Sequence, residues 1–185
     1  DEEERRIDEQ FARLRPILGD KIYSYNDDTL ENAVGALFRG SGMTLSAAES
    51  CTGGKISSLI TSVPGASEYY LGSVTSYAIP VKEKVLGVPE ATINEYGVVS
   101  SEVAAAMAEG ARNLTGSTYA VSTTGLAGPG GDEHNPVGTV WIGIAGPNGT
   151  KTVKKVYKND RKRNIERFAA AAPDELRLFM LSDRK

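Results

Sequence analysis

The residues best suited to chemistry lie in the short segment Ala48-Glu49-Ser50-Cys51-Thr52-Gly53-Gly54. A strand candidate precedes it and an amphipathic helix candidate follows it, which predicts a sharp turn at the edge of a sheet. Ser50 and Cys51 are both side chains that enzymes use as nucleophiles. Two glycines let a substrate approach the backbone closely, and we expect the first amides of the helix to be free for an anion or oxyanion.

Structural explanations compete with this hypothesis. Ser50 or Thr52 is also a favoured helix cap, and a lone cysteine is often a small buried apolar residue. Conversely, a helix N-terminus lowers the pKa of a thiol and favours its nucleophilic form. The residue pattern alone therefore does not separate Ser50 from Cys51, nor catalysis from capping.

A serine nucleophile needs a group that accepts its proton. The chain has a single histidine, His134, in a polar loop, so a zinc site is not expected and a Ser-His-Asp triad would depend on that one residue. A desolvated lysine or a tyrosine can replace histidine, and Tyr77 and Lys82 are the candidates. The alternative for Lys82, within Lys82-Glu83-Lys84, is an exposed charged helix face.

Two further segments are suited to ligand binding. The loop from Thr124 to Gly131 contains four glycines and can wrap a ligand with backbone amides. The run Asp160-Arg161-Lys162-Arg163 can hold a phosphate through guanidinium contacts. Each has a simpler interpretation, as a plain connection and as an exposed helix start respectively.

Size and composition restrict the class of protein. A chain of 185 residues fits one domain, and a net charge of −3 gives no reason to expect nucleic-acid binding. No apolar run reaches the roughly 20 residues that span a bilayer, so no membrane segment is expected. The single cysteine excludes an internal disulfide and fits a reducing, cytoplasmic setting. Because there is no initiator Met, we expect a piece of a longer protein.

The candidate residues lie between alternating helix and strand patterns. This alternation predicts a mixed or parallel sheet covered on both faces by helices. We expect Pro16 to end the first helix and Pro173 to break or kink the last one. The expected helices cover 1–16, from 30, 56–63, from 80, from 100 or 101, and from 160; the expected strands cover 43–48, 74–77, 119–122, 139–145 and 151–157.

Taken together and in order, the motifs resemble the C-terminal domain of the competence/damage-inducible protein CinA, the nicotinamide-mononucleotide deamidase family. The resemblance runs from about Asp28 to Leu181. Besides the Ser50 segment and the pair Tyr77 and Lys82, it is carried by Pro64-Gly65-Ala66-Ser67, Leu86-Gly87-Val88, Tyr96-Gly97-Val98-Val99-Ser100, the loop Thr124 to Gly131, and Pro136-Val137-Gly138-Thr139-Val140-Trp141.

The resemblance implies a three-layer α/β/α sandwich on a mixed, mostly parallel sheet that hydrolyses the carboxamide of nicotinamide mononucleotide, giving nicotinic acid mononucleotide and ammonia. Ser50 would be the nucleophile, Tyr77 and Lys82 would move its proton, and Arg161 would meet the substrate phosphate. The other expected substrate contacts are Glu49, Thr52, Gly53, Gly54, Thr124, Gly125, Gly128 and Gly130.

The resemblance also implies a homodimer in the cytoplasm that needs no metal and no cofactor. Residues 1–27 would be a linker or the remnant of an upstream domain, and residues 28–185 the amidohydrolase domain.

Three positions depart from the family pattern. Tyr77-Ala78-Ile79-Pro80-Val81-Lys82 stands where the family commonly has Tyr-Ser-Asn-Glu-Ala-Lys, Ser73 replaces a usual glycine, and Pro173 lies in a normally continuous helix. The loss of the Asn amide at Ile79 predicts a changed rate or substrate range. It also supports an alternative function, a nucleotide-binding or partner module with weak or lost amidase activity.

Overall fold

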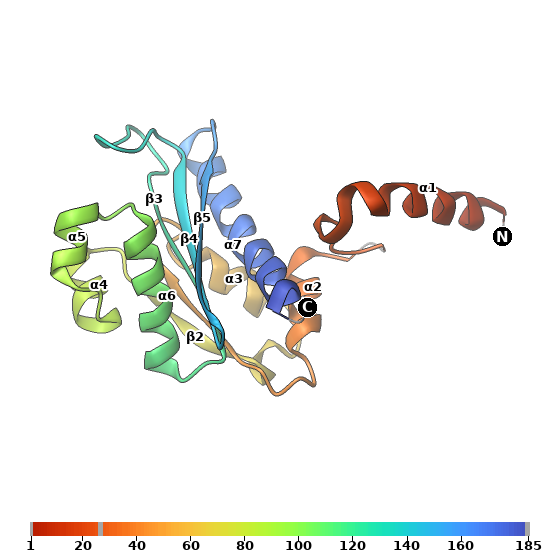
Figure 1. Cartoon of the computed structure of the whole chain (residues 1–185), viewed down its shortest axis with the longest axis horizontal. Coiled ribbons are helices and arrows are strands. Elements are labelled where there is room, and N and C mark those ends of the chain that lie inside the picture. The colour runs from red at the N-terminus through yellow and green to blue at the C-terminus, as the bar shows by residue number, and fades with distance from the viewer. Residues whose placement is uncertain (1, 26–27, 184–185) are drawn as a thin grey trace.

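A computed structural model describes residues 2–25 and 28–183 of the chain. The predicted domain boundary lies between residues 27 and 28. It directly follows residues 26 and 27, which are outside the described part. The elements, in order, are α1 (Glu2–Leu18), η1 (Gly19–Lys21), α2 (Leu30–Phe38), β1 (Leu45–Glu49), α3 (Lys55–Thr61), η2 (Ala66–Glu68), β2 (Tyr70–Thr75), α4 (Ile79–Leu86), α5 (Glu90–Tyr96), α6 (Ser101–Thr115), β3 (Tyr119–Gly125), β4 (Thr139–Gly146), β5 (Gly149–Val156) and α7 (Arg161–Asp183) (Figure 1).

The five strands form one mixed sheet in the order β2-β1-β3-β4-β5. The strands β2, β1 and β3 run parallel, whereas β4 and β5 are an antiparallel hairpin on one side. Their register places Glu49 opposite both Thr75 and Thr123. The carboxyl ends of the three parallel strands therefore meet at one edge of the sheet, which is where ligands bind in open α/β folds.

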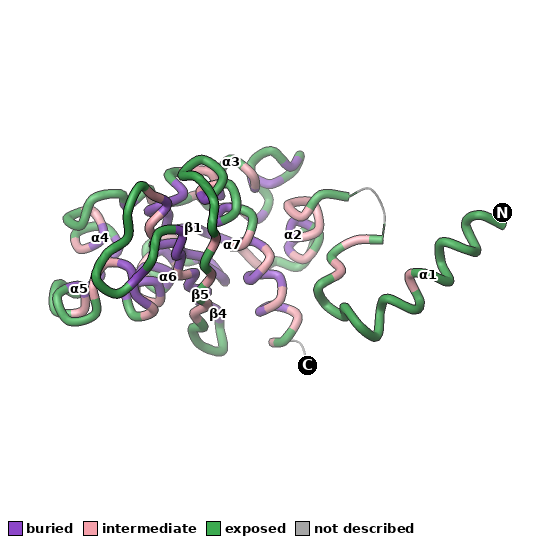
Figure 2. The backbone as a smooth tube through the Cα atoms, turned by 90° about the horizontal axis from the view of Figure 1, so that it is seen from above, coloured by how far each residue is buried: buried purple, intermediate pink, exposed green. Residues whose placement is uncertain are grey.

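Helices cover both faces of the sheet, so the predicted three-layer sandwich is confirmed. One face carries α2, α3 and α7, and the other carries α6 with α4 and α5 packed against it (Figure 1). A large apolar core fills the first interface, and a smaller core around Met107 and Val103 fills the second. Figure 2 shows the buried residues gathered in these layers, while α1 extends away from the sheet and buries none of its residues. Among the described residues, no helix has the length and apolar character to cross a membrane.

Three sequence-based expectations about the elements were wrong. Strand β2 covers Tyr70–Thr75 instead of 74–77, because it alternates between exposed and half-buried residues and lacks a continuous apolar run. Pro16 lies within the last turn of α1, where exposed backbone carbonyls can bind water.

Pro173 does not interrupt α7, which is continuous from Arg161 to Asp183. Residues before and after it, such as Phe168 and Leu176, are fully buried in the same core. Packing of both halves against one sheet offsets the loss of one helical hydrogen bond.

The close contact between α4 and α6 gives a stability prediction at Gly110. A methyl group there would overlap the backbone carbonyl oxygen of Leu86. Gly110→Ala should therefore lower the free energy of unfolding by about 1–3 kcal/mol through overpacking, although alanine is normally the better helix former. Urea denaturation measures the change. The matched control Ala105→Gly should cost about 1 kcal/mol from helix propensity alone, and a stabilised Gly110→Ala variant would contradict the close contact.

Candidate active site

The parallel strands bring three chain segments together at their carboxyl ends. Ser50 follows β1 directly, and its backbone amide donates to the carbonyl of Thr123 in β3 at 3.0 Å. On the other side, the amide of Ser76 donates to the carbonyl of Glu49 at 2.8 Å, which continues the pairing of β1 with β2. Ser50 and the Ser76-Tyr77 segment are thus fixed side by side by backbone hydrogen bonds.

Lys82 joins this edge from α4 and contacts Ser50 directly. Its Nζ donates to the Oγ of Ser50 at 2.9 Å and to the carbonyl oxygens of Ser76 at 2.6 Å and Tyr77 at 3.3 Å. Lys82 is 0% exposed and Ser50 is 8% exposed. The structure therefore brings together the two residues that the sequence placed 32 positions apart, and the exposed-face alternative for Lys82 does not hold.

Burial separates the chemical properties of these side chains. It lowers the pKa of Lys82, because the ammonium loses its hydration, although the nearby Cys51 acts in the opposite direction. Burial raises the pKa of Cys51 to about 12. Cys51 is therefore a neutral thiol near neutral pH, and the expectation of a pKa lowered by the helix N-terminus was wrong. A lysine with a lowered pKa is suited to accept a proton from a serine hydroxyl.

The side chain of Glu49 stabilises the turn between β1 and α3 and does not face the ligand space. It is 0% exposed, and its carboxylate accepts from the amides of Gly54, Ile56 and Ser57 at 2.9, 3.0 and 2.9 Å. A carboxylate in this place satisfies the free amides of a helix start and complements its dipole. The expectation that these amides are open to a substrate oxyanion was therefore wrong.

The remaining residues of the turn shape the backbone. Gly54 caps α3 with a φ of 99°, a conformation that side chains other than glycine rarely adopt. The amide of Gly53 donates to the carbonyl of Ser50, and the hydroxyl of Thr52 is 2.8 Å from that of Thr123. By contrast, the amide of Cys51 donates to no other residue in the described part of the chain. This amide directly follows the candidate nucleophile.

A pocket of about 270 Å³ opens in front of Ser50. Tyr77 and Arg161 form part of its wall, and Arg161 Nη2 donates to the Tyr77 hydroxyl at 3.1 Å. Arg161 Nη1 also donates to the carbonyl of Gly128, which ties the start of α7 to the glycine loop. Tyr77 contacts Lys82 through its backbone carbonyl and not through its phenol. The side chain of Tyr77 is exposed, and its hydroxyl contacts Arg161.

The glycine loop contributes to this pocket unevenly. Thr124 and Gly125 line it, and the hydroxyl of Thr124 donates to the carbonyl of Val98 at 2.7 Å. Gly128 takes part through its contact with Arg161. Gly130 is exposed and does not belong to the pocket wall.

Several pocket residues were not assigned a role from the sequence. Their common feature is that they lie on segments after β3 and between α5 and α6, whose proximity depends on the sheet order. The motif Tyr96 to Ser100 was visible in the sequence but gave no sign of its position. These residues are Val98, Val99, Leu126, Ala127 and Asp132.

Within the described ranges, no three His, Cys, Asp or Glu side chains are grouped as a metal site requires.

The fold and this site define a class: an α/β sandwich with a serine and a buried lysine in contact at the carboxyl edge of its parallel strands. The family model of the CinA C-terminal domain matches residues 27–180, and the chain belongs to this family.

Ile79, which stands where the family commonly has Asn, is the first residue of α4 and lies outside the pocket wall.

Individual relatives support the same family assignment. The chain is 47% identical over 173 residues to a CinA-like protein of Salinibacter ruber, covering 93% of this chain and 42% of the relative. It is 43% identical over 177 residues to a CinA-like protein of Geobacter metallireducens, covering 95% and 43%. The chain thus spans less than half the length of these curated relatives.

Solved structures show the same fold. A competence/damage inducible protein from Agrobacterium tumefaciens superposes with a TM-score of 0.76 at 32% identity, over 80% of this chain and 91% of that one. A CinA superfamily protein from Escherichia coli gives 0.77 at 28% identity, over 87% and 98%.

Proposed function

We propose that this domain is an amidohydrolase that converts nicotinamide mononucleotide to nicotinic acid mononucleotide and ammonia. The observation that carries the proposal is the 2.9 Å contact between the Lys82 Nζ and the Ser50 Oγ at the floor of a pocket. The substrate follows from the family resemblance, and the cationic Arg161 in the wall of the pocket suits its phosphate.

In the first step, neutral Lys82 takes the proton of the Ser50 hydroxyl while Oγ attacks the carboxamide carbon. The carbonyl oxygen becomes an oxyanion, for which the unpaired amide of Cys51 is the nearest donor in sequence. When the tetrahedral species collapses, the carbon–nitrogen bond breaks, and Lys82 returns its proton to the leaving nitrogen, which departs as ammonia.

The second half reverses the roles. Water gives a proton to Lys82 and attacks the ester of Ser50; as the ester bond breaks, Lys82 passes that proton to Oγ, which regenerates the serine hydroxyl and the neutral lysine and releases the carboxylic acid. Lys82 serves both halves because its Nζ is fixed by the carbonyls of Ser76 and Tyr77, which keep it against Ser50. Tyr77 holds Arg161 through its hydroxyl and thereby positions the phosphate contact.

The decisive experiment is to incubate the purified chain with nicotinamide mononucleotide and follow ammonia and nicotinic acid mononucleotide together. We expect both products in equal amounts. Absence of both, with the nucleotide intact across neutral to alkaline pH, would refute the proposal. Thermal stabilisation by the nucleotide without turnover would instead favour the binding-module alternative.

Phosphate recognition gives a separate prediction at Arg161. Arg161→Ala should raise KM for nicotinamide mononucleotide by about 10–100-fold with a smaller effect on kcat, because hydrogen bonds to a charged group contribute about 1.5–3 kcal/mol. The matched control is Arg163→Ala, an exposed arginine on the same helix turn that pairs with Asp160. Equal effects of the two variants would argue against a phosphate site at Arg161.

A further inference from the structure

Among the described residues, two charged side chains of opposite sign, Asp132 and Arg161, line the pocket that contains Ser50. They belong to different segments, the loop after β3 and the start of α7. Arg161 has an assigned partner in the substrate phosphate, whereas the proposed reaction gives Asp132 no task. A pocket with one anion and one cation in its wall is suited to a ligand that carries both charges.

Asp132 is held in place by its own loop. Its Oδ1 accepts from the amides of His134 at 2.9 Å and Asn135 at 2.7 Å. Asn135 is buried, and its Nδ2 donates to the carbonyl of Val99 at 3.0 Å, which fastens the loop to another part of the pocket wall. Both backbone amides donate to Oδ1, and the Asn135 side chain also contributes a hydrogen bond to this carboxylate.

The carboxyl group of Asp132 is ionised at neutral pH. Desolvation would raise its pKa, but the amides of His134 and Asn135 outweigh that effect and lower the pKa below its usual value. Within the described part of the chain, Asp132 forms no ion pair with a lysine or arginine. Its negative charge is therefore available to the pocket.

Nicotinamide mononucleotide has two charges of opposite sign. Its ring nitrogen is a permanent cation in the same ring that carries the reacting carboxamide, and its phosphate is an anion at the other end of the molecule. With the phosphate at Arg161 and the carboxamide at Ser50, the ring lies inside the same 270 Å³ pocket as Asp132. Asp132 and Arg161 are both exposed side chains, so water and salt screen part of the interaction of each with the ligand.

We infer that Asp132 is a specificity-determining residue that selects cationic pyridinium carboxamides over neutral rings of the same shape. This inference rests on the proposed function. Reduced nicotinamide mononucleotide has the same phosphate, ribose and carboxamide but an uncharged dihydropyridine ring, so it isolates the contribution of the ring charge. Asp132 also repels the phosphate, which favours the orientation with the phosphate at Arg161.

The test measures dissociation constants of the oxidised and reduced nucleotides by calorimetry in a Ser50→Ala background, where neither is consumed. Adding Asp132→Asn keeps an oxygen for the amides of His134 and Asn135 but removes the charge. We expect the dissociation constant of the oxidised nucleotide to rise about fivefold, equivalent to about 1 kcal/mol, the upper range for an exposed charge pair, and that of the reduced nucleotide to change less than about twofold.

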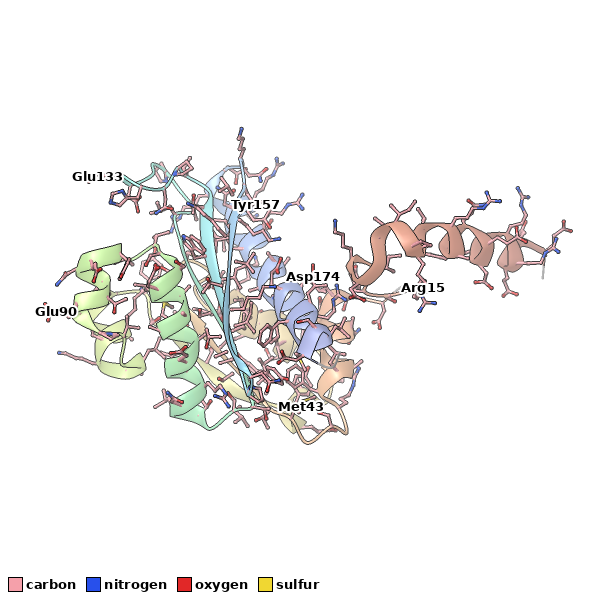
Figure 3. All side chains as sticks on the ribbon, viewed as in Figure 1. Arg15, Met43, Glu90, Glu133, Tyr157 and Asp174 are labelled. Atoms are coloured by element: carbon pink, nitrogen blue, oxygen red, sulfur yellow. The ribbon has the colours of Figure 1, made fainter. Side chains whose placement is uncertain are left out.

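The matched control is Glu133→Gln, which removes a neighbouring charge on the same loop but outside the pocket wall. Figure 3 shows Glu133 at the outer end of that loop. This control should change neither constant.

Equal weakening of both nucleotides by Asp132→Asn would show a role in loop structure only and overturn the inference. Unchanged affinity for both would overturn it as well. Failure of the proposed function is detected separately, as absence of ammonia release by the unmutated chain, so the two outcomes are distinguishable.

Discussion

Ser50→Ala should abolish ammonia release from nicotinamide mononucleotide, lowering kcat by about 10⁴-fold or more, because no other hydroxyl replaces the nucleophile. The residue after it, Cys51, is the obvious rival, yet Cys51→Ala should retain kcat within about threefold. A thiol pKa of about 12 leaves roughly one group in 10⁵ ionised at pH 7. Lys82, in turn, donates to the Ser50 oxygen at 2.9 Å.

Both variants are informative because they replace neighbouring residues of similar size in the same turn. Nucleotide-induced thermal stabilisation should persist in Ser50→Ala, which shows that the pocket remains intact when turnover is lost. Cys51→Ala should cost about 1 kcal/mol of stability or less, since a small buried side chain is shortened by one atom. The reverse pattern, with activity lost in Cys51→Ala and kept in Ser50→Ala, would assign the nucleophile to Cys51.

The sequence was sufficient to predict the sandwich, and the family motifs named Ser50 and Lys82 as candidates, which lie in contact in the structure. Alternating helix and strand patterns defined the layers, and the family motifs related residues distant in the chain. Spacing alone did not reveal that Lys82 is buried, because Lys82-Glu83-Lys84 has the composition of an exposed helix face. Its burial depends on the packing of α4 against α6, which brings the Lys82 side chain to Ser50 and Ser76 at the strand ends, a tertiary property.

The sequence also did not show which way the Glu49 side chain points. Standing at the end of a buried strand and before two glycines, it could face the ligand or the helix that follows. In the structure Glu49 accepts from the amide of the cap residue Gly54 and from two amides of α3, because the first amides of a helix need acceptors wherever water is excluded. Asp132 was missed for a related reason, since its position in the pocket wall depends on tertiary contacts of its loop, among them the Asn135 contact with Val99.

Lys82 links activity to stability, and Lys82→Met should affect the two in different ways. Activity should fall by about 10²–10⁴-fold, the usual contribution of a positioned proton acceptor. Stability should change much less. Methionine leaves the carbonyls of Ser76 and Tyr77 without their donor, at a cost of about 1–3 kcal/mol, but it also removes the penalty of burying an ammonium group.

The pH dependence separates these two contributions. Because the folded-state pKa of Lys82 is lowered from the ordinary 10.5, the unfolded chain binds more protons than the folded chain between the two pKa values. The unmutated chain should therefore gain stability relative to Lys82→Met as pH rises through that window and reach a constant difference above it. Urea denaturation of both proteins from neutral pH to about pH 10 measures this gain.

The same lowered pKa determines the rate profile of the unmutated enzyme. Only neutral Lys82 can accept the Ser50 proton, so log kcat/KM should rise with unit slope and level off at the folded-state pKa, below 10.5. The plateau in the rate must begin at the pH at which the stability difference starts to rise, because both mark the folded-state pKa of Lys82. If the rate levelled off at a pH different from the one at which the stability difference starts to rise, the proton acceptor would be a group other than Lys82.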